Sequence, residues 1–126
     1  MKRIITTKNA PAPIGPYSQA IVANNMLYTS GQIALNPKTN TLVIDDINLE
    51  TKQVMENIKS ILTEAGLTFE NVIKSTIFIA NMDDFSKINE VYGSYFNADT
   101  APARETVQVA RLPKDVNIEI SIIAEY

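Results

Sequence analysis

Hydrophobic and polar positions near the N-terminus are arranged in a way that predicts a β-hairpin. Two apolar runs, at residues 17–23 and 26–33, flank the pair Asn24-Asn25. Because Asn tolerates a positive φ angle, this pair suits a two-residue hairpin turn. Further strands are expected at residues 72–80, about 103–110 and about 117–125, with room for a short one at 3–6 and a turn at 111–116.

Two other segments show the helical period. The first begins near Asn48 and ends at Gly66, which suits the residue just after a helix; its apolar stripe is Val54, Ile58, Ile61, Leu62 and Ala65. A second helix can be capped by Asn81 or Asp83. Its stripe is Phe85, Ile88, Tyr92, Tyr95 and Phe96, which we interpret as core.

The order of these elements, β-β-α-β-α-β-β, predicts an α+β fold with two helices on a mostly antiparallel sheet. Two helices can cover only one face of that sheet. Alternation with a period of two assigns to the covered face Val107, Val109, Ile118, Ile120, Ile122 and Ala124. The same alternation assigns to the open face Arg104, Thr106, Gln108, Ala110, Asn117, Glu119, Ser121 and Ile123.

The open face is therefore expected to carry neutral polar groups, with one Arg (Arg104) and one Glu (Glu119) among them. A fully solvated face would usually hold several Lys and Glu residues. We interpret the surface as one that meets another subunit and holds a small polar ligand. A register slip of one residue would reverse this assignment.

Composition places the chain among ordinary globular proteins. Its 126 residues are expected to form one domain, residues 1–126, with 45% apolar and 20% charged residues. No signal peptide follows Met1, and no apolar run approaches the roughly 20 residues that span a bilayer. We therefore expect a cytoplasmic protein that does not bind membranes.

The absence of two residue types narrows the chemistry. The chain has neither cysteine nor histidine, which removes thiolate nucleophiles, disulfides, the usual general base and the commonest metal ligands. Catalysis would have to use carboxylates, tyrosines, Lys or Arg, backbone groups and water. With a net charge of −3 and no basic cluster, nucleic acid is a poor candidate partner.

Arg104 and Glu119 are the leading candidates for chemistry. The guanidinium group of Arg104 can bind a carboxylate in bidentate fashion, although a structural ion pair explains it equally well. Glu119 can orient or deprotonate a water, unless it is a solvated or salt-bridged strand residue. Tyr17 could hydrogen-bond a ligand or simply pack. Ser30-Gly31 marks either a bulge or a backbone amide offered to a ligand.

Five segments of the chain resemble the RidA/YjgF family of reactive-intermediate deaminases, and together they span nearly the whole length. They are residues 14–19 (IGPYSQ), 28–33 (YTSGQI), 51–54 (TKQV), 88–93 (INEVYG) and the block from Pro102 to Ile120 that contains ARLPKDV. The last block is quite specific. The resemblance implies a chorismate-mutase-like fold that forms a homotrimer around a central barrel, with three clefts between neighbouring subunits.

The resemblance also implies an activity, the hydrolysis of 2-aminoacrylate and 2-iminobutyrate to 2-keto acids and ammonia. Such intermediates are released by pyridoxal-phosphate-dependent serine and threonine dehydratases, which makes these enzymes functional partners. The deaminase itself would need no cofactor and no metal. Carried over by position, Arg104 would bind the substrate carboxylate and Glu119 would position water; the remaining substrate-binding residues would be Tyr17, Ser30, Gly31, Asn89 and Thr106.

The chain departs from the common family pattern at two neighbouring positions. Thr106 stands where many relatives carry Cys, and Glu105 stands where many carry a small residue. Loss of the thiol excludes thiol-based switching there but leaves hydrolysis available. Two alternative functions remain: a non-catalytic, ligand-binding or regulatory trimer, and a ribonuclease or translation inhibitor. The acidic pI and the missing histidines count against the second of these.

Overall fold

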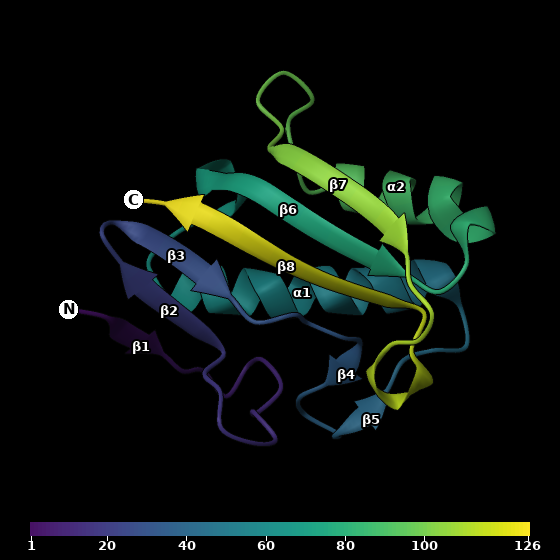
Figure 1. Ribbon diagram of the computed structural model, residues 1–126, viewed down its shortest axis with the longest axis horizontal. Helices are drawn as coiled ribbons and strands as arrows, with labels where there is room; N and C mark the ends of the chain where they lie inside the picture. The colour runs from purple at the N-terminus through teal and green to yellow at the C-terminus, as the bar shows by residue number, and fades with distance from the viewer.

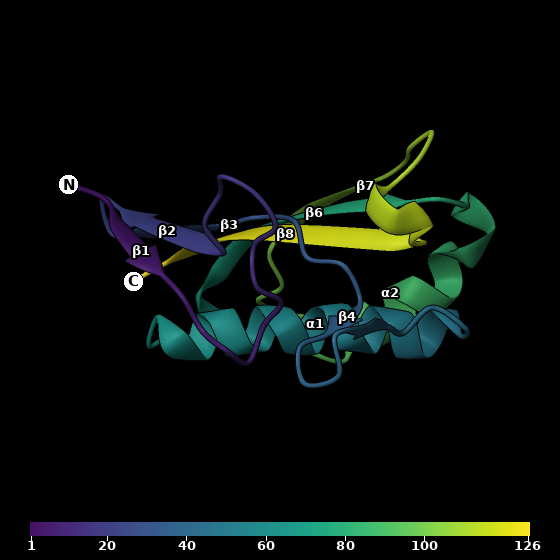
Figure 2. The ribbon, with the colours of Figure 1, turned by 90° about the horizontal axis from the view of Figure 1, so that it is seen from below.

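The computed structural model describes residues 1–126 and contains a six-stranded sheet with both α-helices on one side (Figures 1 and 2). The strand order in the sheet is β1-β2-β3-β8-β6-β7. Its strands are β1 (Arg3–Ile5), β2 (Ala20–Ala23), β3 (Met26–Thr29), β6 (Val72–Ile79), β7 (Ala103–Gln108) and β8 (Ile118–Glu125). The helices are α1 (Ile47–Glu64) and α2 (Phe85–Gly93). These elements confirm the predicted α+β class.

Several short elements connect these strands and helices. Strands β4 (Leu35–Asn36) and β5 (Thr41–Leu42) form a small separate hairpin that the sequence reading treats as a loop. Three 3-10 turns are η1 (Phe69–Asn71), η2 (Met82–Asp84) and η3 (Pro113–Asp115). Neither α-helix combines the length and the hydropathy that crossing a bilayer requires.

The local signals in the sequence are confirmed at the ends of the elements. Asn24 and Asn25 adopt φ angles of 51° and 62°, as a two-residue turn between β2 and β3 requires. Asp46 caps α1 by accepting a hydrogen bond from the Asn48 amide at 2.7 Å. Gly66 has a φ angle of +78° just beyond α1.

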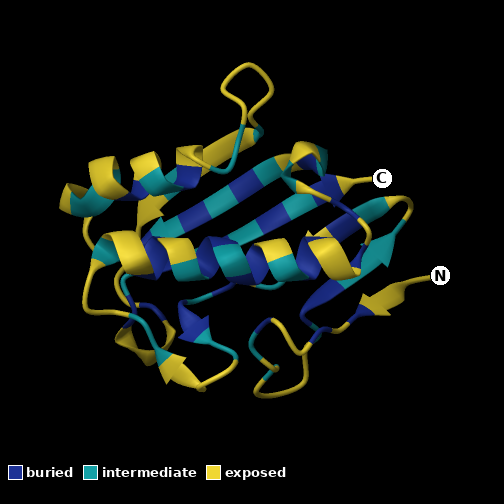
Figure 3. Ribbon diagram, turned by 180° about the vertical axis from the view of Figure 1, so that it is seen from behind, coloured by how far each residue is buried: buried dark blue, intermediate teal, exposed yellow.

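The core lies between the sheet and the helices. Alternate residues of β8 are buried against α1, and Figure 3 shows the resulting stripes of buried positions behind the helix. The predicted stripe of α1 is buried, as are Ile88 and Tyr92 of α2. Tyr95 and Phe96 lie just beyond α2 and pack at the edge of this core against Phe69.

The predicted face of β7 is wrong. Strand β7 pairs in parallel with β6, and this register sets Arg104 beside Ser75 and Thr106 beside Ile77. Ser75 and Ile77 are buried on the helix side, so Arg104 and Thr106 lie on that side too. The reason is that β7 is an edge strand beside α2, where aromatic and polar side chains of the helix can contact a polar strand face. Val107, which was assigned to the helix side, lies on the open face and is 42% exposed.

The open face is also more apolar than expected. Glu119, Ser121 and Ile123 do lie on it, as predicted from β8. The pairing register adds apolar neighbours on the same face: Ile4, Ile21, Tyr28, Phe78 and Val107. An ion pair between Lys74 and Glu105 lies on this face as well. The sheet thus leaves an apolar band without any cover in a single chain.

Candidate functional site

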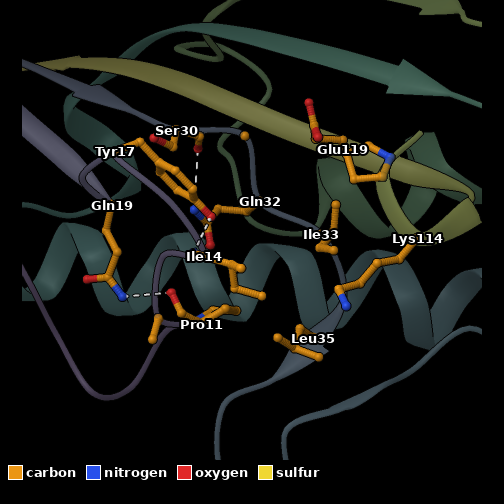
Figure 4. Close-up of a pocket in the computed structure, with 13 residues that line it drawn as sticks. Pro11, Ile14, Tyr17, Gln19, Ser30, Gln32, Ile33, Leu35, Lys114 and Glu119 are labelled. Atoms are coloured by element: carbon orange, nitrogen blue, oxygen red, sulfur yellow. Dashed lines mark hydrogen bonds between the residues drawn. The ribbon is translucent and has the colours of Figure 1, made fainter. Parts of the chain in front are cut away.

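The largest cavity that contains predicted site residues lies where the N-terminal loop crosses the end of β3. This cavity, here named the Glu119 pocket, has a volume of about 570 Å³. It collects Tyr17, Ser30, Gly31 and Glu119, four of the residues predicted from the sequence (Figure 4). Its other walls come from residues 11–14 and 32–35 and from the η3 turn.

Glu119 is the chemically distinctive group of this pocket. Its side chain is half-buried and forms no ion pair. Burial alone raises the pKa of the Glu119 carboxyl, with no hydrogen bond to lower it. A carboxylate that is partly desolvated, unpaired and beside a cavity is typical of groups that handle protons or water.

Gly31 is what allows this carboxylate to lie where it does. A Cβ atom added at Gly31 would lie 2.6 Å from the Glu119 carboxyl carbon and 2.6 Å from its Oε2 atom. Any larger residue at position 31 would therefore displace Glu119. The Gly31 N–H group has no backbone acceptor, so it remains available to a ligand.

The N-terminal loop forms the opposite wall and is held by a buried glutamine. The side-chain amide nitrogen of Gln19 donates to the carbonyl oxygens of Thr7, Ala10 and Pro11, and its Oε1 atom accepts from the Thr7 backbone amide. This anchor positions Tyr17, whose hydroxyl accepts from the Ile14 amide at 3.3 Å and so keeps its own proton for a ligand. In the prediction, Gln19 served only as part of the family segment 14–19.

Ser30 lines the pocket, and both of its hydrogen-bond donors are used within the chain. Its hydroxyl donates to the Ser18 carbonyl at 2.6 Å, and its backbone amide donates to the Gln19 carbonyl at 2.9 Å. Both donors are therefore used to join β3 to the N-terminal loop. Ser30 lines and shapes the Glu119 pocket, and its hydroxyl can take part in ligand binding only as an acceptor.

Lys114 is a pocket residue that the sequence reading missed. Lys114 and Asp115 have positive φ angles of 56° and 57°, uncommon for residues other than glycine. The adjacent Arg111–Asp115 ion pair closes the turn. This backbone directs Lys114 into the pocket, toward Ile33 and Leu35 (Figure 4). The only sequence signal was the position of Lys114 inside the block from Pro102 to Ile120.

Arg104 lies at a second location, here named the Arg104 half-site, between β7 and α2. Its Nη1 atom donates to Asn89 Oδ1 at 2.6 Å, and its guanidinium carbon lies 5.1 Å from the Tyr92 ring centre and 5.6 Å from that of Phe85. No carboxylate pairs with Arg104. A hollow of about 450 Å³ adjoins it, bounded by α2 and the loop before β7.

Thr106 follows Arg104 on the same face of β7. Its hydroxyl oxygen is buried and has no hydrogen-bond partner. The structure thus groups Asn89, Arg104 and Thr106 around the Arg104 half-site, apart from the Glu119 pocket. Within one chain the two groups lie on opposite faces of the sheet. Three or more Asp or Glu side chains are nowhere gathered in a way that could hold a metal ion.

Comparison with known proteins identifies close relatives over the full chain. A family model described as endoribonuclease L-PSP matches residues 7–126. A RutC family protein of Pyrococcus horikoshii is 56% identical over 124 residues, which cover 98% of each chain. The 2-iminobutanoate/2-iminopropanoate deaminase of Salmonella typhimurium is 45% identical over 126 residues, again 98% of each chain.

Solved structures give the same result for the fold. A Rid-family protein of unknown function from Yersinia pestis has a TM-score of 0.97 and 49% identity over the full length of both chains. The TdcF protein of E. coli, crystallised with bound serine, has a TM-score of 0.92 and 44% identity over 98% of both chains. The chain therefore belongs to the endoribonuclease L-PSP family, the YjgF/Rid family that its sequence segments resemble.

Proposed function

We propose that the protein hydrolyses reactive 2-imino and 2-enamino acids, such as 2-iminobutyrate and 2-aminoacrylate, to 2-keto acids and ammonia. The observation that carries this proposal is the unpaired, half-buried Glu119 carboxylate beside an open cavity. Arg104, also without a carboxylate partner, supplies the complementary group for the acid end of the substrate. The Salmonella relative, named as a deaminase of this substrate class, supports the same assignment.

Each site requires two subunits in this proposal. The Glu119 pocket and the Arg104 half-site lie on opposite faces of one sheet, so one chain cannot bring them to the same substrate. A homotrimer built around the open sheet faces would set the Glu119 pocket of one subunit against the Arg104 half-site of the next. The uncovered apolar band and the exposed edge strand β7 support such an assembly.

The reaction follows from the chemistry of these groups. A protonated imine carbon is already electrophilic, so the site must mainly hold the substrate and orient a water. Glu119 takes a proton from the water as its oxygen bonds to the imine carbon, and then returns that proton to the nitrogen. As the C–N bond breaks, ammonia leaves with the nitrogen electron pair, and Glu119 accepts the remaining O–H proton, so that the former water oxygen becomes the keto oxygen. Holding the reactants in this geometry can by itself accelerate the reaction strongly.

Four other residues would complete the binding of substrate. The free Gly31 N–H group and the Tyr17 hydroxyl proton can donate to a substrate oxygen or to the attacking water. Asn89 already accepts a hydrogen bond from Arg104 and so orients its guanidinium group. The buried Thr106 hydroxyl is a further group that can face the acid end of the substrate.

A coupled assay tests the proposal. A threonine dehydratase turns over threonine, and 2-ketobutyrate formation is followed with the wild type, with Arg104→Ala and with the matched control Arg3→Ala. We expect acceleration by the wild type and the control, and none by Arg104→Ala, which should still form the trimer. Full activity of Arg104→Ala would contradict the assignment.

A non-catalytic binding protein is the second candidate, because the related TdcF protein binds serine. Glu119→Ala separates the two functions. A deaminase should lose most of its turnover in this variant while still binding a small carboxylate such as 2-ketobutyrate, measured by calorimetry. If the wild type binds the ligand but shows no turnover, the binding function stands instead.

A further inference from the structure

Glu50 is a carboxylate placed where the helix pattern calls for an apolar side chain. It precedes Val54, Ile58 and Ile61 on the buried stripe of α1, and its residue is 0% exposed. No Lys or Arg pairs with it. Burying an unpaired charge is costly unless hydrogen bonds satisfy it. The position therefore needs an explanation beyond packing.

The main partner of Glu50 is Asn117, which binds both carboxylate oxygens; the Ile118 backbone amide adds a weaker contact. Glu50 Oε2 accepts from the Asn117 backbone amide at 2.7 Å, and Oε1 accepts from the Asn117 side-chain amide at 2.8 Å. The Asn117 carbonyl in turn accepts from the Ala80 amide at 2.9 Å, beyond the end of β6. Asn117 is thus fixed from both sides, by α1 and by β6.

Asn117 lies between the two parts of the Glu119 pocket that come from the C-terminal segment. The η3 turn, with Lys114 and Asp115 at positive φ angles, ends just before it. Glu119 follows two residues after it. Downstream, the Gln32–Ile120 bridge fixes β8 against the segment that contains Gly31. Without the Glu50 bonds, the segment between the turn and this bridge would keep its pairing with β6 and the burial of Val116 and Ile118, but no bond would tie the Asn117 side chain to α1.

We propose that Glu50 is a positioning residue for the Glu119 pocket: through Asn117 it holds the η3 turn and the start of β8, and so fixes the Glu119 carboxylate against Gly31. The expected effect of Glu50 on turnover rests on the proposed function, whereas its expected effect on the position of Glu119 does not. The Asn117 groups that face Glu50 are N–H donors. A carboxylate suits both directly, whereas Gln suits both only if the Asn117 side-chain amide turns over.

Kinetics give the first test. We expect Glu50→Ala to lower kcat for imine hydrolysis about tenfold or more with KM changed less than about twofold, because misplacing a catalytic group affects the chemical step. Glu50→Gln should recover most of that loss, and the exposed control Glu64→Gln should match the wild type. In a Glu119→Gln background, Glu50→Ala should have less than about twofold further effect. An equal loss in both backgrounds would overturn the proposal.

A second test does not depend on activity. The titration of the Glu119 carboxyl carbon is followed by NMR, with Glu119→Gln identifying its resonance. We expect Glu50→Ala to move the pKa of Glu119 toward its ordinary value, and Glu50→Gln and Glu64→Gln to leave it unchanged. An unchanged titration in a folded Glu50→Ala protein overturns the proposal even if no deamination is found. If Glu50→Ala does not fold, Asn117→Ala replaces it, with the same direction expected and a smaller shift.

Discussion

Single residues in the Glu119 pocket work as pairs. Glu119 depends on the missing side chain of Gly31, and Tyr17 depends on a loop that Gln19 holds in place. The charged groups of the site, Glu119 and Arg104, both lack an oppositely charged partner in the chain. The partly buried charge of Glu119 costs stability, so its presence fits a group retained for a ligand.

Gly31→Ala tests the first of these pairs. The new methyl group would overlap the Glu119 carboxyl, which must rotate away from its present position. We expect kcat for imine hydrolysis to fall about tenfold to a hundredfold, since small displacements of catalytic groups have large effects. Stability should change by less than about 1 kcal/mol because the flexible end of Glu119 can move. Thr63→Ala, at an exposed position on α1 that lines neither the Glu119 pocket nor the Arg104 hollow, is the control. Equal losses of kcat in the two variants would contradict the proposed role of Gly31.

Glu119→Gln gives a prediction about stability and pH. Burial raises the pKa of Glu119 above its unfolded value, so the folded state favours the protonated form. The associated stability is present below the unfolded pKa and is lost as pH rises through the folded pKa. Neutral Gln avoids that loss. At pH 8 we expect the free energy of unfolding of Glu119→Gln to exceed that of the wild type by up to about 1 kcal/mol, after allowance for solvent screening, and its Tm to be correspondingly higher.

The gain from Glu119→Gln should shrink toward pH 4, where the wild-type carboxyl is increasingly protonated. Thermal unfolding at both pH values, followed by circular dichroism, measures the difference. A variant less stable than the wild type at pH 8 would mean that the Glu119 carboxylate stabilises the fold. Glu119 would then have a structural role, as a strand carboxylate that neighbouring groups stabilise.

At the scale of elements, helix α1 connects the core to the site. Its N-terminus begins at the Asp46 cap, and its fourth residue, Glu50, bonds to Asn117 before β8. Its last residue is Glu64, and Gly66 turns the chain away just beyond it. The first turn of α1 therefore supports both the helix and the pocket. Further along, Asn57 donates to the Ile33 and Leu35 carbonyls in the pocket wall, while the apolar stripe serves the core.

Asp46→Ala measures how much the N-cap contributes. Asp46 Oδ1 accepts from the amides of Asn48 and Leu49, and alanine leaves both without this acceptor. We expect a loss of about 1 kcal/mol in the free energy of unfolding, measured by urea denaturation. Asp45→Ala removes a neighbouring exposed carboxylate that caps nothing and should cost much less. Equal losses would assign the effect to charge rather than to capping.

The sequence predicted the elements whose signals are local. The Asn24-Asn25 turn and the α1 stripe with Gly66 depend on neighbouring residues alone, and the structure confirms them. The face of β7 depends on its parallel pairing with β6 across a helix, which alternation within one strand cannot specify. For the same reason, the grouping of Arg104 with Glu119 on one face was wrong, although each side chain does border a cavity.

The roles of Lys114 and Glu50 could not be predicted for a different reason. Lys114 enters the pocket because two successive residues adopt positive φ angles, a conformation that a Lys-Asp pair does not signal. Glu50 is a polar residue at a position that continues the apolar stripe of α1, and its partner Asn117 lies 67 residues away in the sequence. Only the folded chain brings such partners together.

At the scale of the whole molecule, the open sheet face has the character of an interface. Its apolar band includes Tyr28, 44% exposed, and Val107, 42% exposed. Monomeric proteins seldom leave such a band in water. The proposed trimer would bury it, and would also complete three sites at once.

Ile123→Lys tests the assembly. A lysine at this central position of the open face would carry a charge into the proposed interface. We expect the trimer to dissociate and imine hydrolysis to be lost with it, as measured by light scattering after gel filtration and by the coupled assay. Leu49→Lys, which changes an exposed apolar residue on α1, should leave the trimer intact. A wild type that is already monomeric would contradict the proposed assembly.

The position of β8 has a consequence for how the protein is made. Of the six strands in the main sheet, β8 comes last in the sequence but lies in the middle of the sheet, between β3 and β6. Strands β1–β3 and β6–β7 are joined in the sheet only through it. A ribosome therefore releases two incomplete sheet fragments into the cell before the strand that unites them emerges. Protease sensitivity of arrested nascent chains should persist until β8 is exposed; early protection would show that the fragments find another way to cover their edges.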